Sequence, residues 1–192
     1  MELQAIETVY NGYKFRSRAE ARWAVFFDAA GIEYQYEPEG FKLSDGTLYL
    51  PDFYLPESDT WFEVKGVLNE IDKHKVEQLI KDSGKPAVIG YADMTFEASD
   101  NWSDESGKRY ELTEKNSSWL CRCKKCEKLW FMGGNGVWSC ACCGTYDGDG
   151  HFEVALVGDS IPSEDVKRVA QAYYKARQAR FEHGTQPRHD YI

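Results

Sequence analysis

The chain has 192 residues, of which 42% are hydrophobic and 15% aromatic, and its formal net charge is −9. This composition supports a packed core and excludes disorder along the whole chain, and no apolar run of about 18 residues is present to span a membrane. The negative net charge argues against a uniformly basic surface that coats nucleic acid.

The amino-terminal segment and the cysteine content bear on cellular location. Residues Met1–Gln4 place no basic region before an apolar stretch, so no secretory signal is expected. The six cysteines are therefore expected in a reducing compartment, where disulfides are rare. The sequence predicts a cytoplasmic protein.

The first predicted helix runs from Ser17 to Ala30. Ser17 is a good N-cap, and Glu20 three positions later completes a capping box. Apolar residues recur at helical spacing, and Gly31 ends the helix. Glu20 has two interpretations: it satisfies a backbone N–H at the helix start, or it is a functional acid at the edge of the stripe that faces the sheet. The carboxylates described below favour the second.

The middle of the chain alternates extended segments with one helix. Extended segments are predicted at Ile32–Tyr36, Phe41–Leu43, Tyr49–Leu55, Trp61–Lys65 and Pro86–Tyr91. A helix is predicted over Leu68–Asp82, with Gly84 past its end. Its predicted inner face comprises Leu68, Ile71, Val76, Leu79 and Ile80.

Charged residues in two of these strands form a candidate catalytic pattern. Side chains two apart on a strand share a face, so Glu63 and Lys65 are expected to face an open site while Phe62 and Val64 are buried. If the two strands pair, Asp52 lies beside Glu63. Two neighbouring carboxylates repel each other and need a cation between them, and Mg²⁺ (or Mn²⁺) suits an all-oxygen site. The alternative interpretation is an ordinary surface ion pair between Glu63 and Lys65.

These residues resemble the PD-(D/E)xK nuclease superfamily, and most closely the phage endonuclease I group of Holliday-junction resolvases. The resemblance covers roughly residues 13–90 and is specific in order and spacing. It is carried by Phe15-Arg16-Ser17 before Glu20, Gly31-Ile32, Pro51-Asp52-Phe53, Leu55-Pro56 and Glu63-Val64-Lys65-Gly66.

The resemblance implies an α/β fold with an αβββαβ restriction-endonuclease-like core and Mg²⁺-dependent hydrolysis of DNA phosphodiester bonds. In such enzymes Asp52, Glu63 and the Val64 carbonyl would hold the metal. Glu20 would assist a second ion or orient water, and Lys65 would position the water and stabilise charge. The resolvase group further implies branched DNA as substrate and a homodimer.

Six cysteines in the second half predict a zinc ribbon. Cys123/Cys126 and Cys140/Cys143 form two C-x-x-C pairs separated by thirteen residues, and four thiolates at this spacing can surround one Zn²⁺. Cys121 and Cys142 are left over, and either could replace a neighbouring ligand. The closed set indicates a structural metal, and the alternative is disulfides or free thiols.

The sequence thus predicts a nuclease core at 1–91, a polar linker or insertion at 92–118, a zinc ribbon at 119–150, and a strand, C-terminal helix and tail at 151–192. The strand is expected at Phe152–Val157, and the helix begins at Pro162 and ends near His183. Candidate nucleic-acid contacts are Lys14, Arg16, Arg18, Arg122, Lys124 and Lys125. The alternative function is a catalytically silent nuclease fold that binds DNA or protein through its zinc ribbon.

Overall fold

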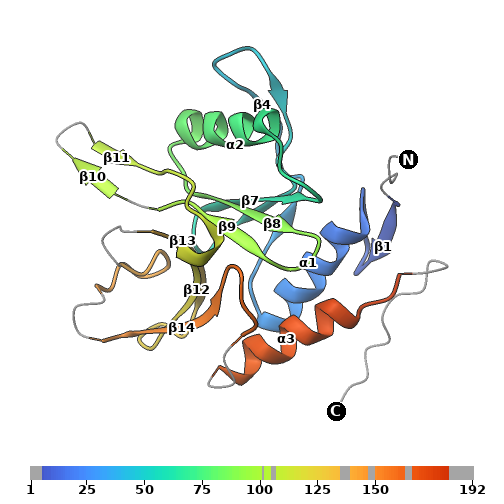
Figure 1. Ribbon diagram of the computed structural model, residues 1–192, viewed down its shortest axis with the longest axis vertical. Helices are drawn as coiled ribbons and strands as arrows, with labels where there is room; N and C mark the ends of the chain where they lie inside the picture. The colour runs from blue at the N-terminus through green and yellow to red at the C-terminus, as the bar shows by residue number, and fades with distance from the viewer. Residues whose placement is uncertain are drawn as a thin grey trace.

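The centre of the computed structural model is a five-stranded mixed sheet with the order β3-β6-β7-β8-β9 (Figure 1). The structure describes residues 6–100, 102–104, 107–134, 139–146, 150–162 and 166–181. The strands of this sheet are β3 Gln35–Tyr36, β6 Phe53–Leu55, β7 Thr60–Lys65, β8 Ala87–Tyr91 and β9 Phe96–Ala98. The chain is therefore of the mixed α/β class.

Strand β7 is the middle of the sheet and is covered on both faces. It pairs antiparallel with β6 and parallel with β8, and the helix α2 (Glu70–Ser83) makes the crossover between β7 and β8. Phe62 packs with α1 (Arg18–Ala30) on one face, whereas Trp61 packs with α2 on the other. Figure 1 shows these helices on opposite sides of the sheet. The face that was expected to be open is therefore buried as well.

Helix α1 has the predicted bounds. Its N-cap is Ser17, whose side chain accepts a hydrogen bond from the Glu20 N–H at 3.2 Å, and Gly31 ends it with φ +66°. Helix α3 (Lys167–Gln178) packs beside α1 (Figure 1). The helices are antiparallel, because Arg168 near the start of α3 lies against Gly31 at the end of α1.

A second, three-stranded sheet has the order β13-β12-β14. Its strands are β12 Ser118–Cys123, β13 Leu129–Gly133 and β14 Phe152–Val157. It shares one apolar core with the first sheet, because the ring of Phe131 lies 5.4 Å from that of Phe62 and 5.0 Å from that of Phe96. The β14 prediction is confirmed.

The segment 92–118, expected to be a polar linker or insertion with parts that dock through Phe96, Trp102 and Tyr110, contributes Phe96 to the core. Phe96 in β9 is fully buried, and β9 pairs antiparallel with β8 as the fifth strand of the central sheet. The rest of the segment forms a hairpin of β10 Trp102–Asp104 and β11 Gly107–Arg109, followed by the 3₁₀ helix η1 Lys115–Ser117. Apolar residues spaced within a polar segment therefore marked packing sites.

Two small hairpins flank the central sheet. They are formed by β1 Thr8–Tyr10 with β2 Tyr13–Phe15, and by β4 Phe41–Lys42 with β5 Leu48–Tyr49. The expected strand Tyr49–Leu55 is thus split between β5 and β6, and Leu50–Asp52 lie outside both. This break leaves Asp52 immediately before the first residue of β6.

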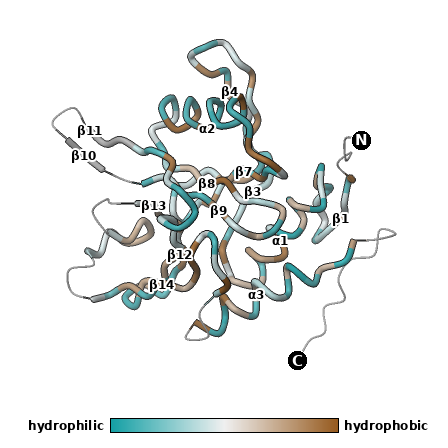
Figure 2. Tube along the Cα trace, viewed as in Figure 1, coloured by the Kyte–Doolittle hydropathy of each residue, from teal (hydrophilic) through white to brown (hydrophobic). Residues whose placement is uncertain are grey.

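Helix α2 begins later than predicted. Asn69 is its N-cap and accepts a hydrogen bond from the Asp72 N–H at 2.8 Å, so the helix starts at Glu70 rather than at Leu68. Figure 2 shows both hydrophilic and hydrophobic positions along α2. Val76, Leu79 and Ile80 are buried as expected, but Ile71 is 69% exposed.

Helix α3 begins at Lys167, later than the predicted start at Pro162. Residues 163–165, the end of the predicted helix beyond 181 and the tail lie outside the described residues, as does 135–138 in the expected ribbon hairpin. Among the helices of the described ranges, none combines the length and apolar character needed to cross a bilayer.

Candidate functional site

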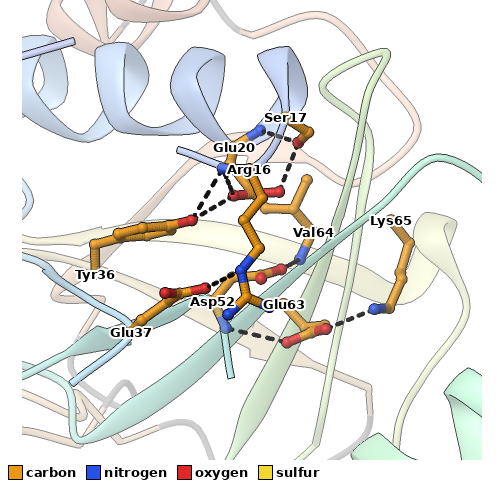
Figure 3. Close-up of polar contacts among 9 residues, drawn as sticks. All are labelled: Arg16, Ser17, Glu20, Tyr36, Glu37, Asp52, Glu63, Val64 and Lys65. Atoms are coloured by element: carbon orange, nitrogen blue, oxygen red, sulfur yellow. Dashed lines mark hydrogen bonds and ion pairs between the residues drawn. The ribbon is translucent and has the colours of Figure 1, made fainter. Parts of the chain in front are cut away.

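The candidate site forms where β7 continues past the end of β6. Phe53, the first residue of β6, pairs with Phe62, so Asp52 lies opposite Glu63. The Asp52 N–H donates to Glu63 Oε2 at 3.2 Å, and the Val64 N–H donates to Asp52 Oδ2 at 2.8 Å. The predicted juxtaposition of the two acids is present, and Figure 3 shows them side by side.

Both acids are buried, with 8% of Asp52 and 4% of Glu63 exposed. Burial raises the pKa of Asp52 well above its ordinary value, and repulsion from Glu63 and then from Glu20 raises it further. Burial also raises the pKa of Glu63, although Lys65 opposes this effect. A pair of carboxylates held so close in the interior favours a proton or a cation between them.

Lys65 supplies one positive charge to this pair. Its Nζ lies 2.6 Å from Glu63 Oε1, and its side chain is 21% exposed. Burial alone would lower the pKa of Lys65, but attraction to Glu63 and the hydrogen bond between them raise it above its usual value. Lys65 is therefore an ammonium ion at neutral pH, partly open to solvent at the end of the strand.

Glu20 projects from the first turn of α1 toward the same region (Figure 3). Its Oε1 accepts a hydrogen bond from Ser17 Oγ at 2.6 Å, and its Oε2 accepts from the Tyr36 hydroxyl at 2.7 Å and the Arg16 N–H at 3.0 Å. The side chain thus caps the segment before the helix, but through the Arg16 N–H rather than the N–H of Ser17 as in a standard capping box. Both interpretations of Glu20 keep physical support, since its charge also raises the pKa of Asp52.

The donor set at Asp52 and Glu63 fits a hard divalent cation. Both acids offer carboxylate oxygens, and the Val64 carbonyl points to the same side of β7 as the Val64 N–H, because both groups of a strand residue face the same neighbour. Within the described ranges, the group of three or more residues that could hold a metal ion is made of cysteines, and Glu20, Asp52 and Glu63 do not form such a group.

Tyr49 was missed by the sequence reasoning. Its hydroxyl is buried and lies close to Glu63. Burial raises its pKa, and the charge of Glu63, a hydrogen bond to Glu63 and the charge of Asp52 raise it further. A tyrosine in an expected strand gives no distinct signal, because only the tertiary structure brings its hydroxyl close to the acids.

The second candidate site is the predicted four-cysteine set. The sulfur atoms of Cys123 and Cys143 lie 3.8 Å apart, and those of Cys126 and Cys140 lie 3.7 Å apart. A tetrahedron with metal–sulfur distances of about 2.3 Å has edges of about 3.8 Å. None of the cysteines is in a disulfide. These four cysteines could therefore hold a structural metal such as zinc.

The two cysteine pairs are held by matching backbone turns. The first cysteine of each pair accepts a hydrogen bond from the N–H four residues later, at 2.7 Å from Glu127 and 2.8 Å from Gly144. Both donor residues have positive φ, +62° and +72°. The turns aim both thiols of a pair to one side, which is the local basis of the ligand geometry.

The structure also shows which four of the six cysteines form the candidate metal site. Cys121 is fully buried beside Trp130, and the Cys142 Sγ lies 3.9 Å from the Leu129 carbonyl oxygen. Neither belongs to the four-sulfur group.

Most of the candidate nucleic-acid contacts already have partners. Lys14 pairs with Glu7 and Arg16 with Glu37, at 2.6 and 2.7 Å. Arg122 pairs with Glu153 at 3.0 Å and also with Glu127, and Lys124 donates to the Gly150 carbonyl. Lys125 is exposed, and the Arg18 Nε is buried without a partner among the described residues. Arg18 is thus the member of this group with unused hydrogen-bonding capacity near Glu20.

Comparison with known proteins adds no assignment. A scan of the chain against models of protein families gives no match, and a search of curated proteins also gives none.

Proposed function

We propose that this chain is a metal-dependent endonuclease of the PD-(D/E)xK type that hydrolyses DNA phosphodiester bonds. The observation that carries the proposal is the buried pair of Asp52 and Glu63 with Lys65 at 2.6 Å from Glu63. A folded scaffold has no structural need for two buried acids whose charges repel each other. A catalytic site that binds a cation does have this need.

In this proposal each residue of the site has its own role. Asp52, Glu63 and the Val64 carbonyl hold Mg²⁺ or Mn²⁺, which when bound lowers the pKa of water and offsets the charge of the phosphate. Lys65 orients the attacking water and stabilises negative charge that develops on the phosphate oxygens. Glu20 orients water from the side of α1.

The order of elements supports the same proposal. Helix α1 precedes β6 and β7, α2 makes a parallel crossover, and β8 returns beside β7. This order is the one that the sequence resemblance implies for residues 13–90. The finer assignment, a symmetric dimer that cuts branched DNA, rests on the resemblance to the resolvase group alone.

Nicking of a supercoiled plasmid tests the chemistry. The parent chain is expected to nick it with Mg²⁺ or Mn²⁺ and not with EDTA, whereas Asp52→Asn and Lys65→Ala should each lose cleavage. Calorimetric titration with Mn²⁺ should show weakened binding for Asp52→Asn and retained binding for Lys65→Ala, because Lys65 acts on water and phosphate rather than on the ion. Lys73→Ala, which removes a partly exposed lysine of α2, is the matched control and should cleave normally.

If Asp52→Asn or Lys65→Ala cleaved like the parent, the assignment of catalysis to these residues would be wrong. A substrate panel of duplex, single-stranded, flap and four-way-junction DNA then tests the finer assignment. Equal cleavage of all four would contradict junction specificity while leaving the endonuclease assignment in place.

A binding module is the second candidate function. Both Glu20 oxygens are engaged in hydrogen bonds, which favours this function. So do the exposed Lys124 and Lys125 on the four-cysteine module, by which we mean the sheet β13-β12-β14 with its four candidate metal ligands. In that case the chain binds DNA or protein without cutting. Retained DNA binding with no cleavage of any substrate in the panel, with either metal, would favour it.

A further inference from the structure

Four arginines gather where α1 and α3 meet, and we name them the arginine pocket: Arg18, Arg22, Arg177 and Arg180. Because the helices are antiparallel, the end of α3 lies beside the start of α1. Arg22 of α1 and Arg177 of α3 line the same pocket, and Arg22 is also repelled by Arg180, two residues beyond α3, and by Arg18. Like charges at this density are unfavourable unless an anion lies among them.

Two of the four arginines line a cavity. A pocket of 140 Å³ is lined by Arg22 and Arg177 together with Ala92, Asp93 and Met94 from the turn after β8. Asp93 is the acidic group in this lining. Its Oδ1 already accepts hydrogen bonds from the Thr95 N–H and hydroxyl, at 3.0 and 2.6 Å. Among the described residues, no ion pair joins Asp93 to Arg22 or Arg177.

Hydrogen-bonding capacity in the pocket is unused. The Nε atoms of Arg18 and Arg22 are buried and have no partner within the described ranges. Arg177 donates from Nη1 to the Tyr173 hydroxyl at 2.9 Å, which leaves its other N–H groups available. A buried N–H without a partner is unfavourable, so these groups are suited to an external acceptor.

The pocket lies next to the candidate active site. The Ala92 N–H donates to the Lys65 carbonyl at 3.2 Å, so the turn that lines the pocket contacts the residue at the end of β7. Trp23 Nε1 donates to the Tyr91 carbonyl at 3.0 Å and joins α1 to the same turn. Arg18 and Arg22, four residues apart, share one face of α1. The turn after β8 thus joins the pocket to the end of β7, where Lys65 lies.

We propose that the arginine pocket binds a phosphate group of the DNA backbone that neighbours the cleaved phosphodiester. Guanidinium groups present paired N–H donors that match phosphate oxygens in charge and geometry. The choice of DNA as the source of the phosphate rests on the proposed function. The pocket would fix the position of the strand, and the carboxylates and Lys65 would act on the bond.

The salt dependence of DNA binding tests the proposal. A short duplex is titrated with the full chain at several salt concentrations, without added Mg²⁺ so that no cleavage occurs. Loss of one phosphate contact lowers the slope of log affinity against log salt by about 1 and weakens binding about tenfold. Arg177→Gln, an exposed position, and the double variant Arg22→Gln/Arg177→Gln are expected to show this change.

The matched control is Lys175→Gln. It removes one charge from the same helix, but residue 175 is exposed and is not part of the pocket lining. Its slope should equal that of the parent. Equal slopes for the parent, Arg177→Gln and the double variant would overturn the proposal, and so would the same loss in the control.

A second arm separates a DNA phosphate from free phosphate. Inorganic phosphate, compared with chloride at equal ionic strength, is expected to raise the Tm of the parent more than that of the double variant. Phosphate stabilisation that depends on the arginines, combined with unchanged DNA slopes, would overturn DNA as the source. If the parent chain cleaves DNA but the arginine variants keep its salt slope, the phosphate-binding proposal is wrong and the proposed function stands. If the variants alter the slope but the parent chain cleaves no DNA, the proposed nuclease function is wrong and the phosphate-binding proposal stands.

Discussion

At the scale of single residues, the unusual feature is the burial of Asp52 and Glu63 side by side. Both pKa values are raised, so the folded protein binds protons at this pair more readily than the unfolded chain does. A carboxyl with a raised pKa contributes stability below its unfolded pKa of about 4 and loses that contribution as pH rises through the folded value. The pair should therefore destabilise the metal-free protein at neutral pH.

The variant Asp52→Asn tests this effect. It keeps an oxygen that can accept from the Val64 N–H but removes one charge, so metal-free stability at neutral pH should hold or rise, and its fall with rising pH should flatten. Denaturant unfolding across pH, without added Mg²⁺, measures this. Asp45→Asn is the control, and its effect on stability at neutral pH should have the opposite sign. Hydrogen bonds from Thr47 lower the pKa of Asp45, so its charged form stabilises the folded protein. A variant that is less stable than the parent at neutral pH would contradict the repulsion between the acids.

Glu20→Gln separates the capping and catalytic interpretations of Glu20. Glutamine keeps one carbonyl oxygen for the Arg16 N–H and the Tyr36 hydroxyl, and its amide can donate to Ser17 Oγ, so stability should fall by less than about 1 kcal/mol. Cleavage should fall at least ~100-fold, because the negative charge is lost.

Plasmid nicking and thermal unfolding measure these two effects. The control for Glu20→Gln is Tyr36→Phe, which removes a hydrogen bond to Glu20 but keeps its charge, and it should cleave at a rate within about tenfold of the parent. Full cleavage by Glu20→Gln would reduce Glu20 to a cap.

At the scale of elements, the ends of α1 and α2 differ in what their terminal glycines contact. Gly31 and Gly84 both have positive φ, +66° and +65°. A Cβ at Gly31 would lie 1.4 Å from Arg168 Nη2, whereas a Cβ at Gly84 would meet nothing within 4 Å. The glycine at the end of α1 therefore serves the packing of α3 as well as the helix end.

Alanine at the two positions should have unequal effects. Gly84→Ala should lower the free energy of unfolding by about 1 kcal/mol, from backbone strain alone. Gly31→Ala should lower it further, because Arg168 must also move. Urea unfolding measures both, and combining Gly31→Ala with Arg168→Ala should bring its effect down to that of Gly84→Ala. Equal effects of the two single variants would show that the contact with Arg168 does not contribute to the free energy of unfolding.

At the scale of the whole molecule, the four-cysteine module and the central sheet are continuous through Phe131, Phe62 and Phe96. Since one core joins both sheets, loss of structure in the module should spread to the rest. The second sheet thus packs directly against the central sheet.

Metal removal tests this continuity. We expect about one Zn²⁺ per chain by elemental analysis, and its removal by a chelator should lower the Tm of the whole chain in a single calorimetric transition. Cys123→Ser should have the same effect, whereas Cys142→Ser should keep the metal because its thiol lies outside the four-sulfur group. Two separate transitions, or the absence of zinc from protein purified without chelator, would contradict this expectation.

The sequence by itself determined the features that arise from interactions between near neighbours. The start and end of α1 at Ser17 and Gly31 follow from capping within a few residues. The four-cysteine set follows from two C-x-x-C turns whose geometry is local. Strand β7 follows from its alternation of residue types, although that pattern did not reveal that both of its faces are covered.

Only the tertiary structure decided the rest, because the deciding contacts join residues far apart in the chain. The pairing of Phe53 with Phe62 sets Asp52 opposite Glu63, and packing of α2 over the sheet turns an expected open face into a buried one. The antiparallel packing of α1 and α3 assembles the arginine pocket from two helices that are separated by most of the sequence. Such contacts depend on sheet register and helix packing, which no local pattern encodes.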